Sequence, residues 1–401
     1  MMTRLIAGIA CVLLATGATT PPPAASPAAI PLDGSYSQFG FSALRELRAE
    51  QPGSNIFISP TSVAIALAMV ANGAEGSTRS AILQTLGAQN ETIDALNAAN
   101  QTLIARLGES QAVQLSIANA LWLQQGFPLK PAFREALGTS YGAQADNLDF
   151  RSAGAPAVVN AWAAKHTHDR IQKIVDTIDS STIIMLANAV AFKGKWTLPF
   201  DPKSTQPHDF TTAAGVVRKV PMMQNAAEYA YANRGGIQAI RLPYADGTFA
   251  MYVVLPQDAG AMQSFLSNLT PDTFADLRSS LESKRGTIEL PRFTITFAAR
   301  LNGMLAKLGM GIAFGRAANF DGIHPAPPPL QISEVRHASY LKVDEEGTEA
   351  AAVTTVGVVA LAIRANVAPF TMIVDRPFFL AIRDEHSGQI LFTGTIADPG
   401  A

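Results

Sequence analysis

The 401-residue chain has a single cysteine, Cys11, which falls in an apolar segment near the N-terminus. One thiol cannot form a disulfide within the chain, and a metal site built from several cysteines is excluded as well. Lysine and arginine number 30 against 32 aspartates and glutamates, which gives a net charge of −2. We find no basic run of the kind that follows nucleic-acid phosphates or an anionic membrane surface. The sequence therefore predicts neither a nucleic acid nor a membrane as partner.

The common catalytic motifs are also missing. The chain has no Gly-x-Ser-x-Gly elbow, no His-Glu-x-x-His, no Walker loop, no dinucleotide fingerprint and no cysteine pair. A Ser-His-Asp triad can be scattered along a sequence, so a secreted hydrolase stays open as an alternative. His166 and His168 lie two residues apart, but a metal site needs three or four convergent ligands. We therefore expect no enzyme activity, no metal and no cofactor.

The N-terminus has the three-part layout of a secretory signal peptide. An early Arg4 precedes an apolar stretch from Leu5 to Ala15, and small residues and prolines follow. This apolar stretch is too short to span a membrane. We expect a signal peptide and leader over 1–25 and a disordered Pro/Ala-rich leader over 26–35. Cleavage would remove Cys11, and the mature protein would be secreted or periplasmic.

Helix-like and strand-like segments are interleaved after the leader, without the regular rhythm of a parallel α/β protein. Apolar residues at helical spacing predict helices at 36–47, 61–74, around Phe133, at 158–174 and at 298–310. Runs rich in β-branched and aromatic residues predict strands at 113–126, 181–196, 237–256, 286–297, 370–384 and 388–399, with a hairpin around Asp246-Gly247 and an interruption at Pro291. The composition does not change after the leader. We therefore expect a single domain over 36–401, of the α+β class, with large antiparallel or mixed sheets.

The segment from Val343 to Phe370 begins with an acidic cluster and a glycine, and then runs from Ala350 to Ile363 without a charge. Its alanines, valines and threonines favour a buried strand, in which alternate side chains share a face. One face would hold Thr348, Ala350, Ala352, Thr354 and Val356, and the other Glu349, Ala351, Val353 and Thr355. The only charge among these nine residues therefore has the outward parity. An ordinary core strand or a buried helical turn is the alternative.

Beyond these patterns, the chain resembles the serpin family over nearly all of its length after the leader. The resemblance rests on several blocks in the family's order: NIFISPTSVAIALAMVANGAEGSTRSAILQTL, LANAVAFKGKWTLPFDPKSTQPHDF, VRKVPMM, LPRFTI and DRPFFLAIRDEHSGQILFTGTIADP. The segment VDEEGTEAAA resembles the hinge of the family's reactive-centre loop. The resemblance implies one domain of three β-sheets and eight or nine helices, with an exposed loop over about 345–370.

In inhibitory serpins a target protease attacks this loop, forms an acyl-enzyme and is trapped when the freed loop inserts into the main sheet. The resemblance therefore implies a secreted, monomeric suicide substrate of serine proteases. Small side chains on the Thr348 face suit a preformed core, the alanines lower the entropy lost on insertion, and Gly347 permits the backbone to swing. A non-inhibitory serpin, acting as a binding, carrier or chaperone-like protein, is the alternative. Such members tend to lose the small-residue hinge, which this chain keeps.

Further positions carry over from the family one at a time. The hinge comprises Glu345, Gly347, Thr348, Glu349, Ala350, Ala351 and Ala352. The shutter, a polar group beneath the strands that must part, comprises Ser59, Ser62, Asn188 and His337. The breach, where the loop first enters the sheet, comprises Lys193, Trp196 and Arg292. Arg292 has the position of the base that pairs with the hinge glutamate Glu345.

The resemblance also indicates which bond the protease cuts. In the family this bond lies about sixteen residues beyond the hinge glutamate, which gives Leu361-Ala362 in this chain. Because apolar pockets bind apolar side chains, we expect a chymotrypsin-, elastase- or subtilisin-like target. A shift to Arg364 would instead predict a trypsin-like enzyme, and a cysteine protease stays open as a further class of target.

Overall fold

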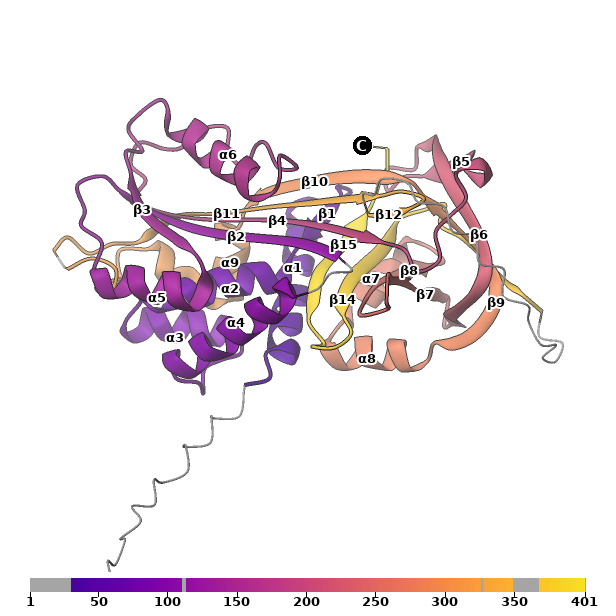
Figure 1. The fold of residues 1–401 in the computed structure, drawn as a ribbon, viewed down its shortest axis with the longest axis horizontal. Coiled ribbons are helices and arrows are strands. Elements are labelled where there is room, and N and C mark those ends of the chain that lie inside the picture. Colours follow the sequence, from indigo (N-terminus) through magenta and orange to yellow (C-terminus); the bar gives the residue numbers. More distant parts are fainter. Residues whose placement is uncertain (1–29, 110–112, 326, 349–367, 401) are drawn as a thin grey trace, which may run out of the picture.

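The computed structural model describes residues 30–109, 113–325, 327–348 and 368–400. Within these ranges nine α-helices and fifteen strands form a mixed α+β fold with two hydrogen-bonded sheets (Figure 1). The expected fold class is therefore confirmed. The expected signal segment and most of the expected loop, residues 1–29 and 349–367, lie outside the described residues. No helix in the described ranges is long and apolar enough to cross a membrane.

One helix lies at the centre of the fold. All twelve residues of α2 are buried, which is expected of a helix that is apolar on every side. It packs between α1 and the two sheets, where it contacts β4 and β15. The bounds of the helices are α1 Asp33–Glu50, α2 Pro60–Ala71, α3 Gly76–Thr85, α4 Ile93–Gly108, α5 Pro131–Tyr141, α6 Ala155–His166, α7 Ala259–Ser267, α8 Pro271–Ser279 and α9 Asn302–Leu305.

The smaller sheet has the strand order β10-β11-β4-β2-β3, with the short β12 paired to β4. Its strands are β2 Val113–Gln124, β3 Gln144–Leu148, β4 Ile184–Lys195, β10 Phe293–Arg300, β11 Ile332–Val343 and β12 Gly347–Thr348. The central strand β4 pairs antiparallel with β2 and parallel with β11. Nearly every residue of β4 is buried, which explains its continuous apolar sequence.

The larger sheet has nine strands in the order β1-β15-β14-β8-β7-β6-β9-β13, with β5 paired to β6. Its strands are β1 Ile56–Ile58, β5 Gln206–Thr211, β6 Val217–Arg234, β7 Ile237–Tyr244, β8 Phe249–Pro256, β9 Glu282–Pro291, β13 Phe370–Ile373, β14 Phe378–Asp384 and β15 Ile390–Ile396. Three sheets were expected, whereas the described strands form two hydrogen-bonded networks. The reason is the 18-residue β6, which pairs with β5, β9 and β7 in turn and so joins two groups of strands.

The helix expected at 158–174 ends at His166, eight residues early. His168 and Asp169 have φ values of 52° and 62°, so the chain turns back at this point. Ile171 and Ile174 continue the apolar spacing, but they are buried beside Trp162 by the returning segment. The apolar pattern therefore predicted the buried residues correctly, but it placed the end of the helix eight residues too late.

Two other expected boundaries differ from the structure. The first helix begins at Asp33, inside the range 26–35 that was assigned to the leader. The helix expected at 298–310 is reduced to the four residues of α9, followed by a π-helical turn in which Gly309 has a φ of 114°. Pro291 does interrupt the strand expected at 286–297, and the resulting β9 and β10 belong to different sheets.

Candidate functional site

The two faces of β4 contact different parts of the core. Leu186, Val190 and Phe192 face the main core together with α2. Met185, Ala187 and Ala189 face the opposite side, where they form a second cluster with Trp122 of β2 and Trp162 of α6. Figure 1 shows α6 alone on this outer face of the smaller sheet, while α2 and its neighbours lie on the inner face. The inner face is thus covered by helices, whereas α6 covers only part of the outer face, where Thr294 and Thr296 of β10 are exposed.

A row of polar side chains crosses the centre of this sheet. Asn119 of β2, Asn188 of β4 and His337 of β11 lie directly opposite one another in the strand register. All three are buried, with exposed fractions of 7%, 1% and 0%. Because buried polar groups require partners, this row must form its hydrogen bonds within the protein.

The hydrogen bonds of the row reach the N-terminus of α2. His337 Nδ1 lies 2.6 Å from Asn188 Oδ1, and Asn188 Nδ2 donates to Ser62 Oγ at 2.5 Å and to Asn119 Oδ1 at 2.6 Å. Ser59 is the N-cap of α2: its hydroxyl accepts from the backbone N–H of Ser62, and its own N–H lies 3.4 Å from His337 Nε2. All four expected shutter residues therefore belong to one network.

The partners of His337 define its protonation state. The N–H of Ser59 can only donate, so Nε2 of His337 accepts and the ring proton sits on Nδ1. This proton is donated to the side-chain oxygen Oδ1 of Asn188. Complete burial lowers the pKa of His337 to about 3, because a charged imidazolium would lose its hydration there. The ring is thus neutral in the folded protein.

The hinge begins with a tight turn at the end of β11. Asp344 and Gly347 form an isolated bridge, and the chain then pairs antiparallel with β4 through Gly347 opposite Lys195 and Thr348 opposite Gly194. Gly347 has a φ of 151°, and an added Cβ would lie 2.1 Å from the carbonyl oxygen of Gly194. Only glycine fits this close approach of hinge and strand.

The breach residues hold this turn in place. Trp196 donates from Nε1 to Asp344 O at 2.9 Å and from its backbone N–H to Glu346 O at 3.0 Å. Its indole is buried and stacks on Tyr244, with ring centroids 4.4 Å apart. These contacts fix the backbone of the acidic cluster against the end of β4.

Glu345 is buried at 6% exposure and pairs with the expected base. Its Oε1 lies 3.4 Å from Arg292 Nη1 and accepts from Thr205 Oγ1 at 2.7 Å. The guanidinium of Arg292 is half-exposed, so the ion pair is partly screened by water. Lys193 is half-buried one residue before Gly194, and none of the described residues pairs with its ammonium group.

Sequence reasoning missed two members of these networks. Asn119 lies inside a strand that was expected, and its place opposite Asn188 would have followed from a known register. Thr205 had no signal in the sequence.

Some expected residues lie outside the described part of the chain: Glu349, Ala350, Ala351, Ala352 and the expected bond Leu361-Ala362. Within the described ranges no three His, Cys, Asp or Glu side chains gather as a metal site, and His166 Nδ1 lies 2.8 Å from the carbonyl oxygen of Trp162.

Replacing His337 with glutamine tests the neutral, buried state of this ring. Unfolding restores an imidazole pKa near 6.5, so between pH 6.5 and about 3 the unfolded chain binds a proton that the folded chain does not. The effect of His337 on the free energy of unfolding is therefore absent above pH 6.5, and below it this free energy falls by about 1.4 kcal/mol for each pH unit. We expect His337→Gln to remove this slope from the urea midpoints measured between pH 7 and 5. The exposed His386→Gln should keep it, and equal slopes in all three proteins would contradict the assignment.

The family model "Serpin (serine protease inhibitor)" matches residues 34–399. Serpin-Z10 of Arabidopsis thaliana is 34% identical over 361 residues, which cover 86% of this chain and 92% of the relative. Serpin A3-1 of Bos taurus is 33% identical over 375 residues, which cover 92% and 89%.

Solved structures share the same fold. Human thyroxine-binding globulin, complexed with thyroxine, superposes with a TM-score of 0.86 at 27% identity, covering 92% of this chain and 99% of its own. The native state of tengpin, a thermophilic serpin, gives 0.82 at 30% identity, with coverage of 91% and 94%. The mouse protein-Z dependent protease inhibitor gives 0.84 at 25% identity, with coverage of 92% and 97%. The family model, the relatives and the shared fold agree, and the chain belongs to the serpin family.

Proposed function

We propose that this protein is an inhibitory serpin, secreted or periplasmic, that traps a serine protease as a suicide substrate. The observation that carries the proposal is the pairing of β12 with β4 beside the junction of β4 and β11. Two residues of the hinge already run antiparallel to the central strand, in a fixed register. Insertion of the cleaved loop would extend this short ladder toward the shutter.

The register of β12 determines where each loop residue would lie. Because Gly347 is opposite Lys195 and Thr348 is opposite Gly194, each further loop residue moves one position back along β4. Ala350 would come opposite Phe192, Ala352 opposite Val190 and Thr354 opposite Asn188. In this register a threonine hydroxyl arrives between Asn188 and His337, where the insertion must separate a hydrogen-bonded pair.

The same register assigns a face to each loop residue, since directly opposite residues of two strands share a face. Thr348, Ala350 and Ala352 would face the main core with Gly194, Phe192 and Val190. Glu349 would lie opposite the unpaired Lys193 and could neutralise it. Val353 would lie opposite Ala189, which is buried under α6. This outward-facing side chain would therefore enter the second apolar cluster rather than solvent.

Strand directions also favour insertion. β4 and β11 pair parallel, which is slightly less stable per residue than antiparallel pairing. An inserted strand would run antiparallel to both neighbours, so one parallel ladder would be replaced by two antiparallel ones. The intact protein would then be held in a less stable state by the kinetic barrier to opening the sheet.

A non-inhibitory carrier is the second candidate function. The observation that favours it is the likeness to thyroxine-binding globulin, whose structure is complexed with thyroxine. A carrier does not need an insertable loop. This chain, in contrast, approaches β4 so closely at Gly347 that only glycine fits there, and a run of alanines follows in the sequence. These features support the inhibitory proposal.

Incubation with a panel of proteases tests the proposal. We expect chymotrypsin- or elastase-like enzymes to form a complex that survives a denaturing gel, with the released C-terminal fragment beginning at Ala362. An inhibitor leaves this covalent band, a carrier is only nicked, and a hydrolase shows neither. If trypsin forms the complex and the fragment begins after Arg364, the assignment of Leu361 is wrong but trapping stands. If serine and cysteine proteases nick the loop and none of them forms the covalent band, trapping is refuted.

Thr348→Arg tests the register. Thr348 pairs with Gly194 in the intact protein, but β12 has only two residues there and could unpair to leave an arginine in solvent. In the inserted strand the residue would be held opposite Gly194, at a place so crowded that a Cβ added to Gly194 would lie 2.9 Å from Val113. A buried, unpaired guanidinium there should cost several kcal/mol and slow insertion. Hydrolysis of the acyl-enzyme would then outrun trapping, and more inhibitor would be consumed per protease trapped.

Glu349→Arg is the matched control, because the same side chain is placed one residue further on the opposite face. Two like charges opposite one another on a strand pair cost less than about 1 kcal/mol, so inhibition should be largely retained. The quantity to measure is the number of inhibitor molecules consumed per molecule of protease trapped. Equal values for the two variants would mean that this register does not govern insertion.

A further inference from the structure

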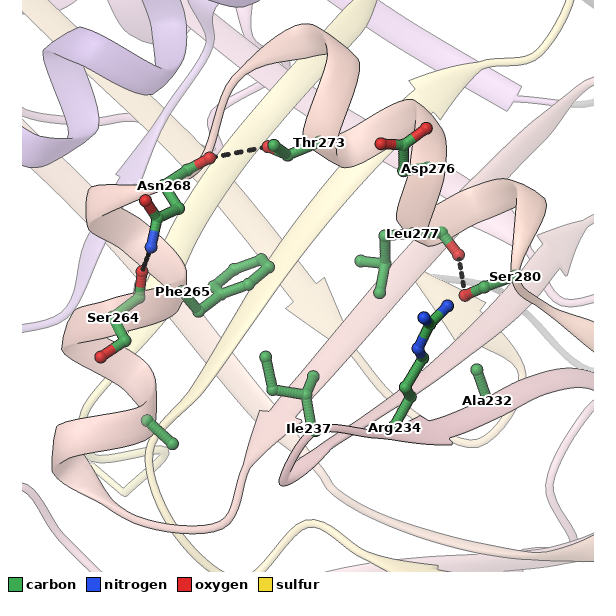
Figure 2. A pocket seen from close by; sticks show the side chains of 12 residues that line it. Ala232, Arg234, Ile237, Ser264, Phe265, Asn268, Thr273, Asp276, Leu277 and Ser280 are labelled. Atoms are coloured by element: carbon green, nitrogen blue, oxygen red, sulfur yellow. Dashed lines mark hydrogen bonds between the residues drawn. The ribbon is translucent and has the colours of Figure 1, made fainter.

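A groove of about 490 Å³ lies far in sequence from the hinge, between the β6–β7 hairpin and the helices α7 and α8. Figure 2 shows its floor, formed by the side chains of Ile237, Phe265 and Leu277, and Arg234 reaching over it from the hairpin. The three apolar residues are only partly buried. Small-molecule sites commonly have this size and an apolar lining with a few polar groups.

The hairpin sequence explains why a cation and an apolar residue meet here. Gly235 and Gly236 have φ values of 60° and 75°, which a two-residue turn between twisted strands requires. Arg234 and Ile237 are therefore directly opposite one another and project from the same face of the hairpin. The carbonyl oxygen of Gly236 accepts from the backbone N–H of Gln257 at 2.8 Å, which fixes the tip of the hairpin near the start of α7.

Three neutral polar side chains of the groove already donate hydrogen bonds within the helical segment. Asn268 donates to Ser264 O at 2.9 Å, Thr273 donates to Asn268 O at 2.7 Å, and Ser280 donates to Leu277 O at 2.7 Å (Figure 2). The exposed side chain of Arg234, in contrast, has no hydrogen-bond or ion-pair partner among the described residues. Its guanidinium is therefore the one cationic group in the groove that can bind a ligand, and it offers the planar fork that matches a carboxylate.

We propose that this groove binds a small amphipathic monocarboxylate, such as a medium-chain fatty acid. The hydrocarbon chain would cover Ile237, Phe265 and Leu277, and the carboxylate would accept from Arg234. Asp276 on α8 also lines the groove and would repel a second negative charge, which disfavours polyanions. The proposal does not depend on protease trapping, because the hinge, shutter and breach contribute no residue to the groove.

Titration calorimetry with decanoate and with decanol, which has the same chain but no charge, tests the proposal. We expect one saturable decanoate site in the full-length protein. Arg234→Gln should weaken decanoate binding about tenfold and leave decanol binding unchanged, because a hydrogen-bonded charge pair is lost. Arg151→Gln, which removes an exposed arginine elsewhere, should change neither affinity.

Two further variants test the apolar part of the site. Ala261→Trp places a large side chain in the groove, and Leu277→Glu places a negative charge on its floor. We expect the first to abolish binding of both ligands and the second to weaken decanoate more than decanol, with thermal midpoints close to that of the unmodified protein. The absence of saturable decanoate binding would overturn the proposal. Equal effects of Arg234→Gln and Arg151→Gln, or unchanged binding by whichever of the Ala261 and Leu277 variants folds, would overturn it as well.

Discussion

The direct parallel pairing of β4 with β11 is the contact on which the rest of the structure depends. It closes the centre of the smaller sheet, and the hydrogen bond between Asn188 and His337 fastens it at mid-length. Parting the strands would leave two buried atoms, His337 Nδ1 and Asn188 Oδ1, without this partner, at a cost of about 1–3 kcal/mol each. Because the same network caps α2 through Ser59 and Ser62, the closed sheet is tied to the central helix of the core. If the loop inserts as proposed, this network would contribute to the barrier that insertion has to cross.

The hinge and breach lie at the end of the same strand pair. The indole of Trp196 and the ion pair between Glu345 and Arg292 hold the turn after β11, and Gly347 lets the backbone approach β4 closely. Loop residues entering from this end would meet the apolar core first and the shutter last. A new central strand would add hydrogen bonds on both sides, each contributing about 1 kcal/mol, and so a gain of order 10 kcal/mol, comparable to the whole stability of a typical domain. A protein that withholds such a gain needs a kinetic barrier rather than equilibrium stability.

Much of this arrangement could be predicted from the sequence, but for different reasons in different places. The apolar run of β4 and the glycine-containing turn at Asp246-Gly247 are local signals, and both elements are present. The ends of α6 and α9 were wrong, because residues such as Ile171 keep a helical apolar spacing while packing from a returning segment. The family resemblance identified Ser59, Ser62, Asn188 and His337, which nothing in their spacing connects. Asn119 and Thr205 were missed because their roles depend on strand register and on contacts across 140 residues.

If the cleaved loop enters the sheet, the protein gains stability, and the thermal midpoint after cleavage measures this gain most directly. A single cut between 356 and 364, with the two fragments left associated, should raise the midpoint by about 10 °C or more, because a central strand is added to the smaller sheet. An ordinary loop or core strand gives the opposite result, since cutting a chain normally weakens the fold. A midpoint that is unchanged or lower after cleavage would contradict the insertion account.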